Sequence, residues 1–74
     1  MSRLIRMDHT GHSTLAEWTE HDQAAFDTAV DEFRSQLDEG YIAVVNDGPG
    51  QATQVRELPR DADLVIMRRP IAGG

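Results

Sequence analysis

The stretch DQAAFDTAVDEFRSQLDEG, residues 22–40, decides the fold, because it contains the clearest repeating pattern in the chain. Its apolar residues recur at helical intervals, at Phe26, Ala29, Val30, Phe33 and Leu37. In a helix of about 3.6 residues per turn, these intervals place the side chains in one stripe, and charged residues fill the positions between them. The stretch therefore predicts an amphipathic helix that buries one side against another layer of structure.

Residues at both ends of this stretch can bound the helix. Asp22 can act as the N-cap of a helix that begins at Gln23, and Thr19 is the alternative cap, with Asp22 then at the third helical position. Gly40 can follow the last turn, because glycine readily adopts the left-handed conformation that commonly ends a helix. We therefore expect the helix to occupy the residues between Asp22 and Gly40.

Two β-compatible segments precede the helix and three follow it. Residues 3–8 and 13–19 flank the turn sequence HTGH and predict a β-hairpin. Residues 41–45 and 64–67 are apolar at every position, which predicts strands that are covered on both faces. Residues 54–58 alternate between polar and apolar and predict an outer strand.

The expected order of elements is β-β-α-β-β-β in a single domain, since a chain of 74 residues can form only one small core. One helix stripe packed on a mixed sheet makes a two-layer α+β domain. A hairpin, a crossing helix and a last strand that returns to the centre of the sheet form the ubiquitin-like β-grasp plan. Another small α/β sandwich with the same element order is the alternative. We expect Trp18, Phe26 and Phe33 in the core, a body over residues 1–70 and a C-terminal tail over residues 71–74.

Composition excludes several classes of function. The formal net charge of −6 argues against binding to the phosphates of nucleic acids. No segment has the roughly 18 consecutive apolar residues of a membrane span, and no signal peptide is evident, so we expect a cytoplasmic protein without membrane contacts. The chain contains no cysteine and therefore no disulfide or thiolate ligand. So small a core leaves no room for a deep active site, and we expect neither an enzyme nor a cofactor.

Charge is distributed unevenly along the chain. Between residues 17 and 39 Arg34 is the one basic residue, among eight acidic ones: Glu17, Glu20, Asp22, Asp27, Asp31, Glu32, Asp38 and Glu39. From residue 52 onward, arginines outnumber acidic residues. This division fits either a solvated helix face or a surface complementary to a partner.

His9 and His12, in the sequence DHTGH, are the weak candidates for a metal site. Together with Asp8, two imidazoles could hold a divalent metal ion. Histidines in an exposed turn of an acidic chain are more commonly bystanders, so we expect no metal.

The last residues, Pro70, Ile71, Ala72, Gly73 and Gly74, are the strongest candidates for chemistry. A terminal carboxylate becomes a good electrophile only after activation, for example as an acyl-adenylate. An enzyme that activates it must thread the end of the chain through a narrow channel, and two residues without a Cβ can pass where side chains would clash. Pro70 ends strand hydrogen bonding and begins the threadable segment.

The C-terminal half resembles a known family. The turn LPRDAD (residues 58–63), the strand LVIM (residues 64–67) and the end PIAGG (residues 70–74) are similar to the small β-grasp sulfur-carrier proteins. These are the small subunit of molybdopterin synthase and its thiamin and cysteine-pathway relatives. The resemblance covers residues 41–74, and in the N-terminal half only the element order matches. Arg69 stands where the family has a proline before Pro70, and Arg68 makes this approach more basic, as in the arginine-bearing tail of ubiquitin.

The resemblance implies a function. Gly74, preceded by Gly73, would be adenylated by an ATP-dependent enzyme of the ubiquitin-activating type and converted to a thiocarboxylate. The tail would then deliver the sulfur to an acceptor protein, or would be conjugated to a target protein if the chain is a modifier. The residues expected to contact these partners are Arg68, Arg69, Pro70, Ile71 and Ala72.

Two other classes of function remain open at the level of sequence. Tail-assembly proteins of lambda-like phages resemble the same fold and have a similar Pro-x-Ala-Gly ending, so the chain could be a structural or assembly component of a virion. A protein-interaction module without any tail chemistry is the other alternative.

Overall fold

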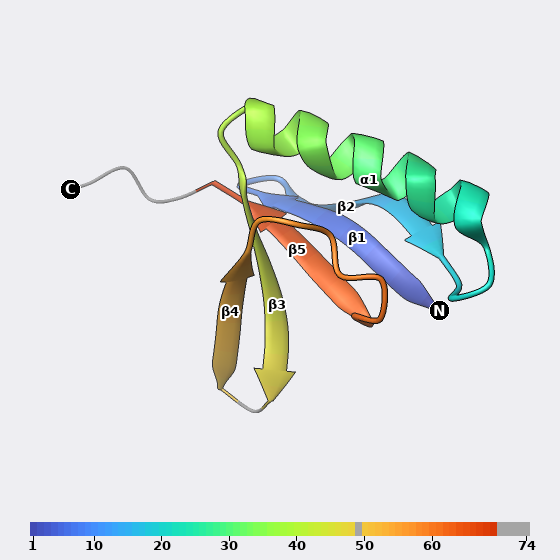
Figure 1. Cartoon of the computed structure of the whole chain (residues 1–74). Coiled ribbons are helices and arrows are strands. Elements are labelled where there is room, and N and C mark those ends of the chain that lie inside the picture. Colours follow the sequence, from blue (N-terminus) through green and yellow to red (C-terminus); the bar gives the residue numbers. More distant parts are fainter. Residues whose placement is uncertain (49, 70–74) are drawn as a thin grey trace.

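The computed structural model describes residues 1–48 and 50–69. The elements, in chain order, are β1 (Ser2–Asp8), β2 (Gly11–Trp18), α1 (Gln23–Asp38), β3 (Ile42–Gly48), β4 (Gln51–Val55) and β5 (Leu64–Arg68). One helix packs against a mixed sheet, so the predicted α+β class is confirmed (Figure 1). The proposed tail, residues 71–74, lies outside the described residues.

The sheet has five strands in the order β2-β1-β5-β3-β4. β1 and β5 are parallel, whereas the pairs β1–β2, β3–β5 and β3–β4 are antiparallel. The last strand of the chain therefore lies at the centre of the sheet, as the sequence predicts.

The helix has the predicted bounds and caps. The Asp22 carboxylate accepts a hydrogen bond from the backbone N–H of Ala25 at 3.0 Å. Thr19 is not the N-cap, because only its carbonyl oxygen takes part, accepting a bond from the Asp22 N–H at 3.1 Å. At the other end, Gly40 has φ of +96°, a conformation that residues with a Cβ rarely adopt. Within the described residues no helix combines the length and hydropathy needed to cross a bilayer.

Loss of the N-cap should measurably destabilise the domain. Replacing Asp22 by alanine leaves the Ala25 N–H without its side-chain acceptor, and we expect a loss of about 1 kcal/mol in the free energy of unfolding. Asp22→Ser, which can accept the same bond, should lose much less. Urea unfolding followed by circular dichroism measures both; equal losses in the two variants would contradict the capping role.

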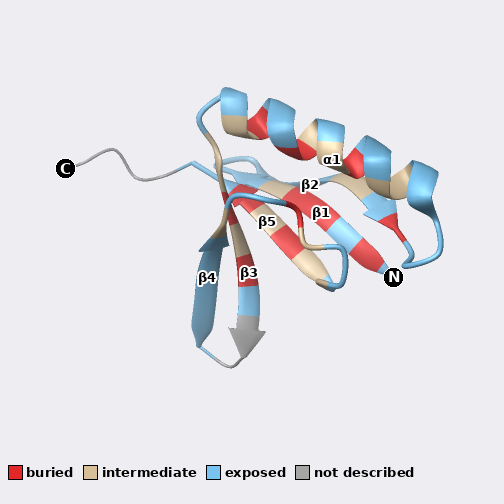
Figure 2. Ribbon diagram, viewed as in Figure 1, coloured by how far each residue is buried: buried red, intermediate tan, exposed pale blue. Residues whose placement is uncertain are grey.

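The core lies between α1 and one face of the sheet (Figure 2). Its buried residues are Leu4, Trp18, Ala29, Phe33, Ala43, Val45, Leu58, Val65 and Met67. The predicted core positions of Trp18 and Phe33 are confirmed, with exposed fractions of 2% and 1%. The Trp18 indole N–H is also satisfied, because it donates to the Arg60 carbonyl oxygen at 3.0 Å.

Phe26 is only half-buried, so its predicted place inside the core is wrong. Its ring packs edge-on against Trp18, with ring centroids 5.6 Å apart. The Arg60 guanidinium lies over the ring, 4.3 Å from its centroid, and also bonds to Gln23 in the same turn of α1. The first turn of α1 thus faces a loop residue, Arg60, and not a strand. Part of the Phe26 ring therefore stays exposed.

The second hairpin differs from the sequence expectation. Pairing of β3 with β4 continues through Asn46 and Ala52, so β3 extends beyond the predicted 41–45 and β4 lies three residues before the predicted 54–58, with a shorter connection between them. Gly50, with φ of +73°, supplies the turn conformation that permits this tight connection. Leu58 lies outside any strand but is buried in the core.

The prediction that the apolar strands are covered on both faces is wrong. The side chains of Val45, Val65 and Met67 are buried beneath α1, but the apolar residues that alternate with them, Val44, Leu64 and Ile66, are only half-buried. A single helix can cover only one side of the sheet. Within the described residues, the second side is therefore an open apolar face.

Candidate functional site

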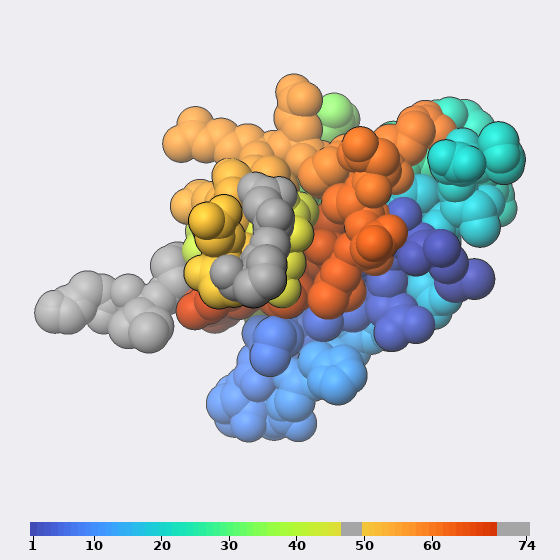
Figure 3. Space-filling view, turned by 90° about the horizontal axis from the view of Figure 1, so that it is seen from below, coloured from blue at the N-terminus to red at the C-terminus, as the bar shows by residue number. Residues whose placement is uncertain are grey.

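The open sheet face carries a continuous apolar row. The strand registers pair Ile66 of β5 with Ile5 of β1 on one side and with Val44 of β3 on the other, so the three side chains lie on the same face. Ile66 and Val44 are half-buried, whereas Ile5 is buried. Two residues further along β5 and on the same face, Arg68 lies between Met7 of β1 and Ile42 of β3. Figure 3 views the molecule from the side away from α1, where strands and loops form the surface and the helix is almost hidden.

A shallow hollow of about 600 Å³ lies on this face. Its apolar lining comes from Met7, Val44, Ala52 and Ile66, and its basic lining comes from His9, Arg68 and Arg69. Asp8 and Asn46 complete it. Met7 is 46% exposed, an unusual position for a large apolar side chain. Apolar side chains bordered by arginines suit the docking of a partner that offers apolar groups and carboxylates.

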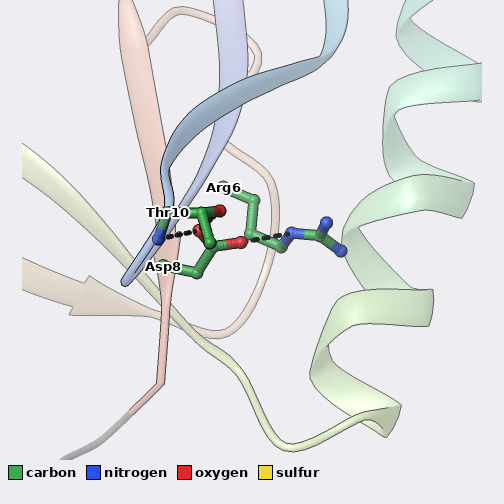
Figure 4. Close-up of polar contacts among 3 residues, drawn as sticks. All are labelled: Arg6, Asp8 and Thr10. Carbon is green, nitrogen blue, oxygen red and sulfur yellow. Dashed lines mark hydrogen bonds and ion pairs between the residues drawn. The ribbon is translucent and has the colours of Figure 1, made fainter.

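An ion pair connects the first hairpin turn to the edge of this site. The Asp8 carboxylate accepts two hydrogen bonds from Thr10, one from its backbone N–H at 2.9 Å and one from its hydroxyl at 2.6 Å (Figure 4). The other oxygen, Oδ2, lies 3.9 Å from Arg6 Nε. The Thr10 hydroxyl bond is the main cause that lowers the pKa of Asp8, and the Thr10 N–H and the charges of Arg6 and His9 act in the same direction.

The lowered pKa of Asp8 predicts a dependence of stability on pH. The folded state favours the ionised carboxylate, so its contribution is present above the unfolded pKa and is lost as pH falls through the folded pKa. Asp8→Asn should therefore lower Tm at neutral pH, and its difference from wild type should shrink as pH falls from about 5 towards 2. Thermal unfolding across this range measures the difference, and a constant difference would contradict the role of the carboxylate.

Tyr41 is a residue that the sequence analysis missed as part of the site. The guanidinium carbon of Arg6 lies 5.8 Å from the centroid of its ring, and that of Arg69 lies 5.1 Å away. Both distances lie within the range of cation–π contacts. The only available sequence signal is an aromatic residue directly after Gly40, where the helix ends.

The structure locates some, but not all, of the residues predicted from sequence. Arg68 and Arg69 are both exposed and line the hollow. His9 and His12 are exposed, and no three His, Cys, Asp or Glu side chains in the described part of the chain are grouped to hold a metal ion. The remaining candidates, Pro70, Ile71, Ala72, Gly73 and Gly74, lie outside the described residues.

The fold and the site together define a small α+β domain with an apolar sheet face bordered by arginines. Comparison with known protein families, curated proteins and solved structures finds no match to this chain. Its function must therefore be inferred from its own residues and their geometry.

Proposed function

We propose that this chain is a ubiquitin-like β-grasp protein of the sulfur-carrier or modifier type, whose Gly74 carboxyl group is activated by a partner adenylating enzyme. The fold supports this proposal in its details. A hairpin is followed by a helix that crosses one face of the sheet, and the last strand returns to the centre, parallel to the first. This arrangement is compatible with the β-grasp plan that the resemblance of residues 41–74 implies.

The observation that carries the proposal is the position of β5. Its last residue, Arg68, lies on the open face and borders the hollow. Gly74 is six residues further along the chain. Six residues can span at most about 20 Å. An enzyme docked on the open face would therefore have the carboxyl group of Gly74 within reach of its own active site.

The chain would serve as a substrate and carrier rather than as a catalyst. The Gly74 carboxylate attacks the α-phosphorus of ATP, and the bond to pyrophosphate breaks, leaving an acyl-adenylate. A hydrosulfide ion then attacks the acyl carbon, AMP leaves with the bonding electrons, and loss of the proton from sulfur gives a thiocarboxylate. Gly73 and Gly74 offer no Cβ that could block a narrow channel.

The decisive experiment is intact-mass spectrometry of the chain purified from its host. If the chain is a carrier, the purified sample should contain a species that is heavier by the mass difference between one sulfur and one oxygen atom. If the chain is a modifier, the sample should instead contain conjugates of higher mass. With an adenylating enzyme from the same genome, pyrophosphate should be released from ATP only when the chain is present. An unmodified mass together with no pyrophosphate release would contradict the proposal.

The open apolar face also favours a second candidate, a protein-interaction module without tail chemistry. Such a module would bind its partner equally well after Gly74 is deleted. Binding within a virion assembly would belong to this class and would be recognised by copurification with the assembled particle.

Met7 offers a direct test of the docking face. Met7→Ser removes an exposed apolar side chain, and we expect the chain to bind its adenylating enzyme about tenfold more weakly. Met7→Leu keeps the apolar contact and should bind like wild type. Calorimetric titration measures both affinities, and similar Tm values would exclude unfolding as the cause. Equal binding by the serine and leucine variants would remove Met7 from the interface.

A further inference from the structure

We propose that Tyr41 is a positioning residue that holds Arg69 against the body and thereby fixes the point from which residues 70–74 depart. This inference rests on the proposed function, because it concerns how Gly74 is presented to the adenylating enzyme. The contacts that carry it are the two guanidinium–ring pairs, Arg6–Tyr41 and Arg69–Tyr41, here called the Tyr41 stack.

The ring of Tyr41 belongs to the rigid part of the molecule. Its backbone N–H donates to the Gln36 carbonyl oxygen at 3.0 Å, which ties it to the last turn of α1. The side chain is half-buried and packs against the core cluster. Since the backbone on one side of the ring is fixed by α1 and on the other by β3, the ring can serve as an anchor.

Arg6 supplies the other guanidinium of the stack and is itself restrained. Figure 4 shows its guanidinium extending from β1 towards α1, with Asp8 and Thr10 behind it. The Asp8 carboxylate, 3.9 Å from Arg6 Nε, offsets part of the repulsion between the Arg6 and Arg69 guanidiniums at one ring. The stack therefore joins β1, the connection between α1 and β3, and the residue that follows β5.

Arg68, the residue before Arg69, has different contacts. Arg68 lies on the open face between Met7 and Ile42, and it makes no ion pair or ring contact with other described residues. Of two adjacent residues with the same side chain, Arg69 contacts the body and Arg68 stays available to a partner. The two arginines that the sequence leaves indistinguishable thus have different roles.

The absence of cysteine allows a test that does not depend on activity. Nitroxide labels on Gln54→Cys and Ala72→Cys report, by pulsed electron paramagnetic resonance, the distances between β4 and the C-terminal segment. The wild-type distance distribution is the reference. Tyr41→Leu and Arg69→Met should each reduce its most populated distance, relative to all others, about two- to fivefold. Tyr41→Phe and Arg68→Met should leave it unchanged.

Two results would overturn the inference. One is a distance distribution that is the same in wild type, Tyr41→Leu and Arg69→Met. The other is an equal effect of Arg68→Met, since a general loss of charge would then explain the change. Arg69→Met keeps the measurement valid even if Tyr41→Leu fails to fold, because Arg69 is exposed and outside the core.

The same variants separate this inference from the proposed function. In an ATP–pyrophosphate exchange assay with the adenylating enzyme, Tyr41→Leu should lower kcat/KM about two- to fivefold, with activity restored in Tyr41→Phe. If wild type supports no exchange, the proposed function fails. The distance measurement then still tests whether Tyr41 positions Arg69. If wild type is active and the leucine variant equals it in both assays, the positioning role alone is rejected.

Discussion

On the carrier proposal, deletion of Gly74 should abolish activation of the chain while leaving its Tm unchanged. The carboxyl group would then belong to Gly73 and would end one residue, about 3.5 Å, short of the reacting position. Reacting atoms must approach to about 3–3.5 Å, and a misplacement of 1 Å can already cost about 10²-fold in rate. We therefore expect ATP–pyrophosphate exchange to fall by at least about 10²-fold.

Two controls make this result specific to the carboxyl group. Binding of the adenylating enzyme, measured by calorimetry, should change little on deletion of Gly74, because the apolar face around Met7 and Ile66 is intact. Addition of one alanine after Gly74 should be as harmful to exchange as the deletion, since it moves the carboxyl group by the same distance in the other direction. Full activity of the deletion variant would eliminate the carrier proposal.

Replacing Phe33 by alanine should have the largest effect on stability. The ring is 1% exposed and fills the space between α1 and the sheet, and removing it loses apolar burial and leaves a cavity. Such changes cost about 3–5 kcal/mol. Native domains are stable by only about 5–15 kcal/mol, and a small one is expected towards the lower end, so much of the total stability would be lost.

Phe26→Ala is the matched control, because it removes the same side chain from the same helix at a half-buried position. Since solvent already reaches part of the Phe26 ring, its loss should open a surface groove rather than a cavity and should cost less. Urea unfolding, followed by the fluorescence of the single tryptophan, Trp18, compares the two variants. An equal or greater loss in Phe26→Ala would contradict this account of the core.

The helix could be predicted with Asp22 as one of two candidate N-caps, whereas the pattern of the apolar strands predicts a cover on both faces that the structure does not have. The stripe from Phe26 to Leu37 and the Asp22 cap depend on residues three or four positions apart, so the sequence contains the interaction itself. The strand at 41–45 is apolar throughout, and local pattern alone suggests cover on both faces. Only the packing of a single helix on one side reveals that Val44 lies on an open face.

The residues of the candidate site could likewise be predicted only in part. Arg68 and Arg69 could be selected from sequence because they precede Pro70, but nothing in the sequence distinguishes the two. Pairing of β5 with β1 and β3 places Arg68 on the open face, between Met7 and Ile42. Arg69, one residue further, meets Tyr41.

The sequence by itself determined the helix, the order of elements and the apolar strands, because each follows from interactions between near neighbours along the chain. The tertiary structure alone decided which side of the sheet stays open and which side chains from distant parts of the chain meet. The contacts of Tyr41 with Arg6 and Arg69, and the bond of Trp18 to Arg60, join residues far apart in sequence. Such contacts depend on strand register and on the face that the helix covers, and both are set by the packing of the whole domain.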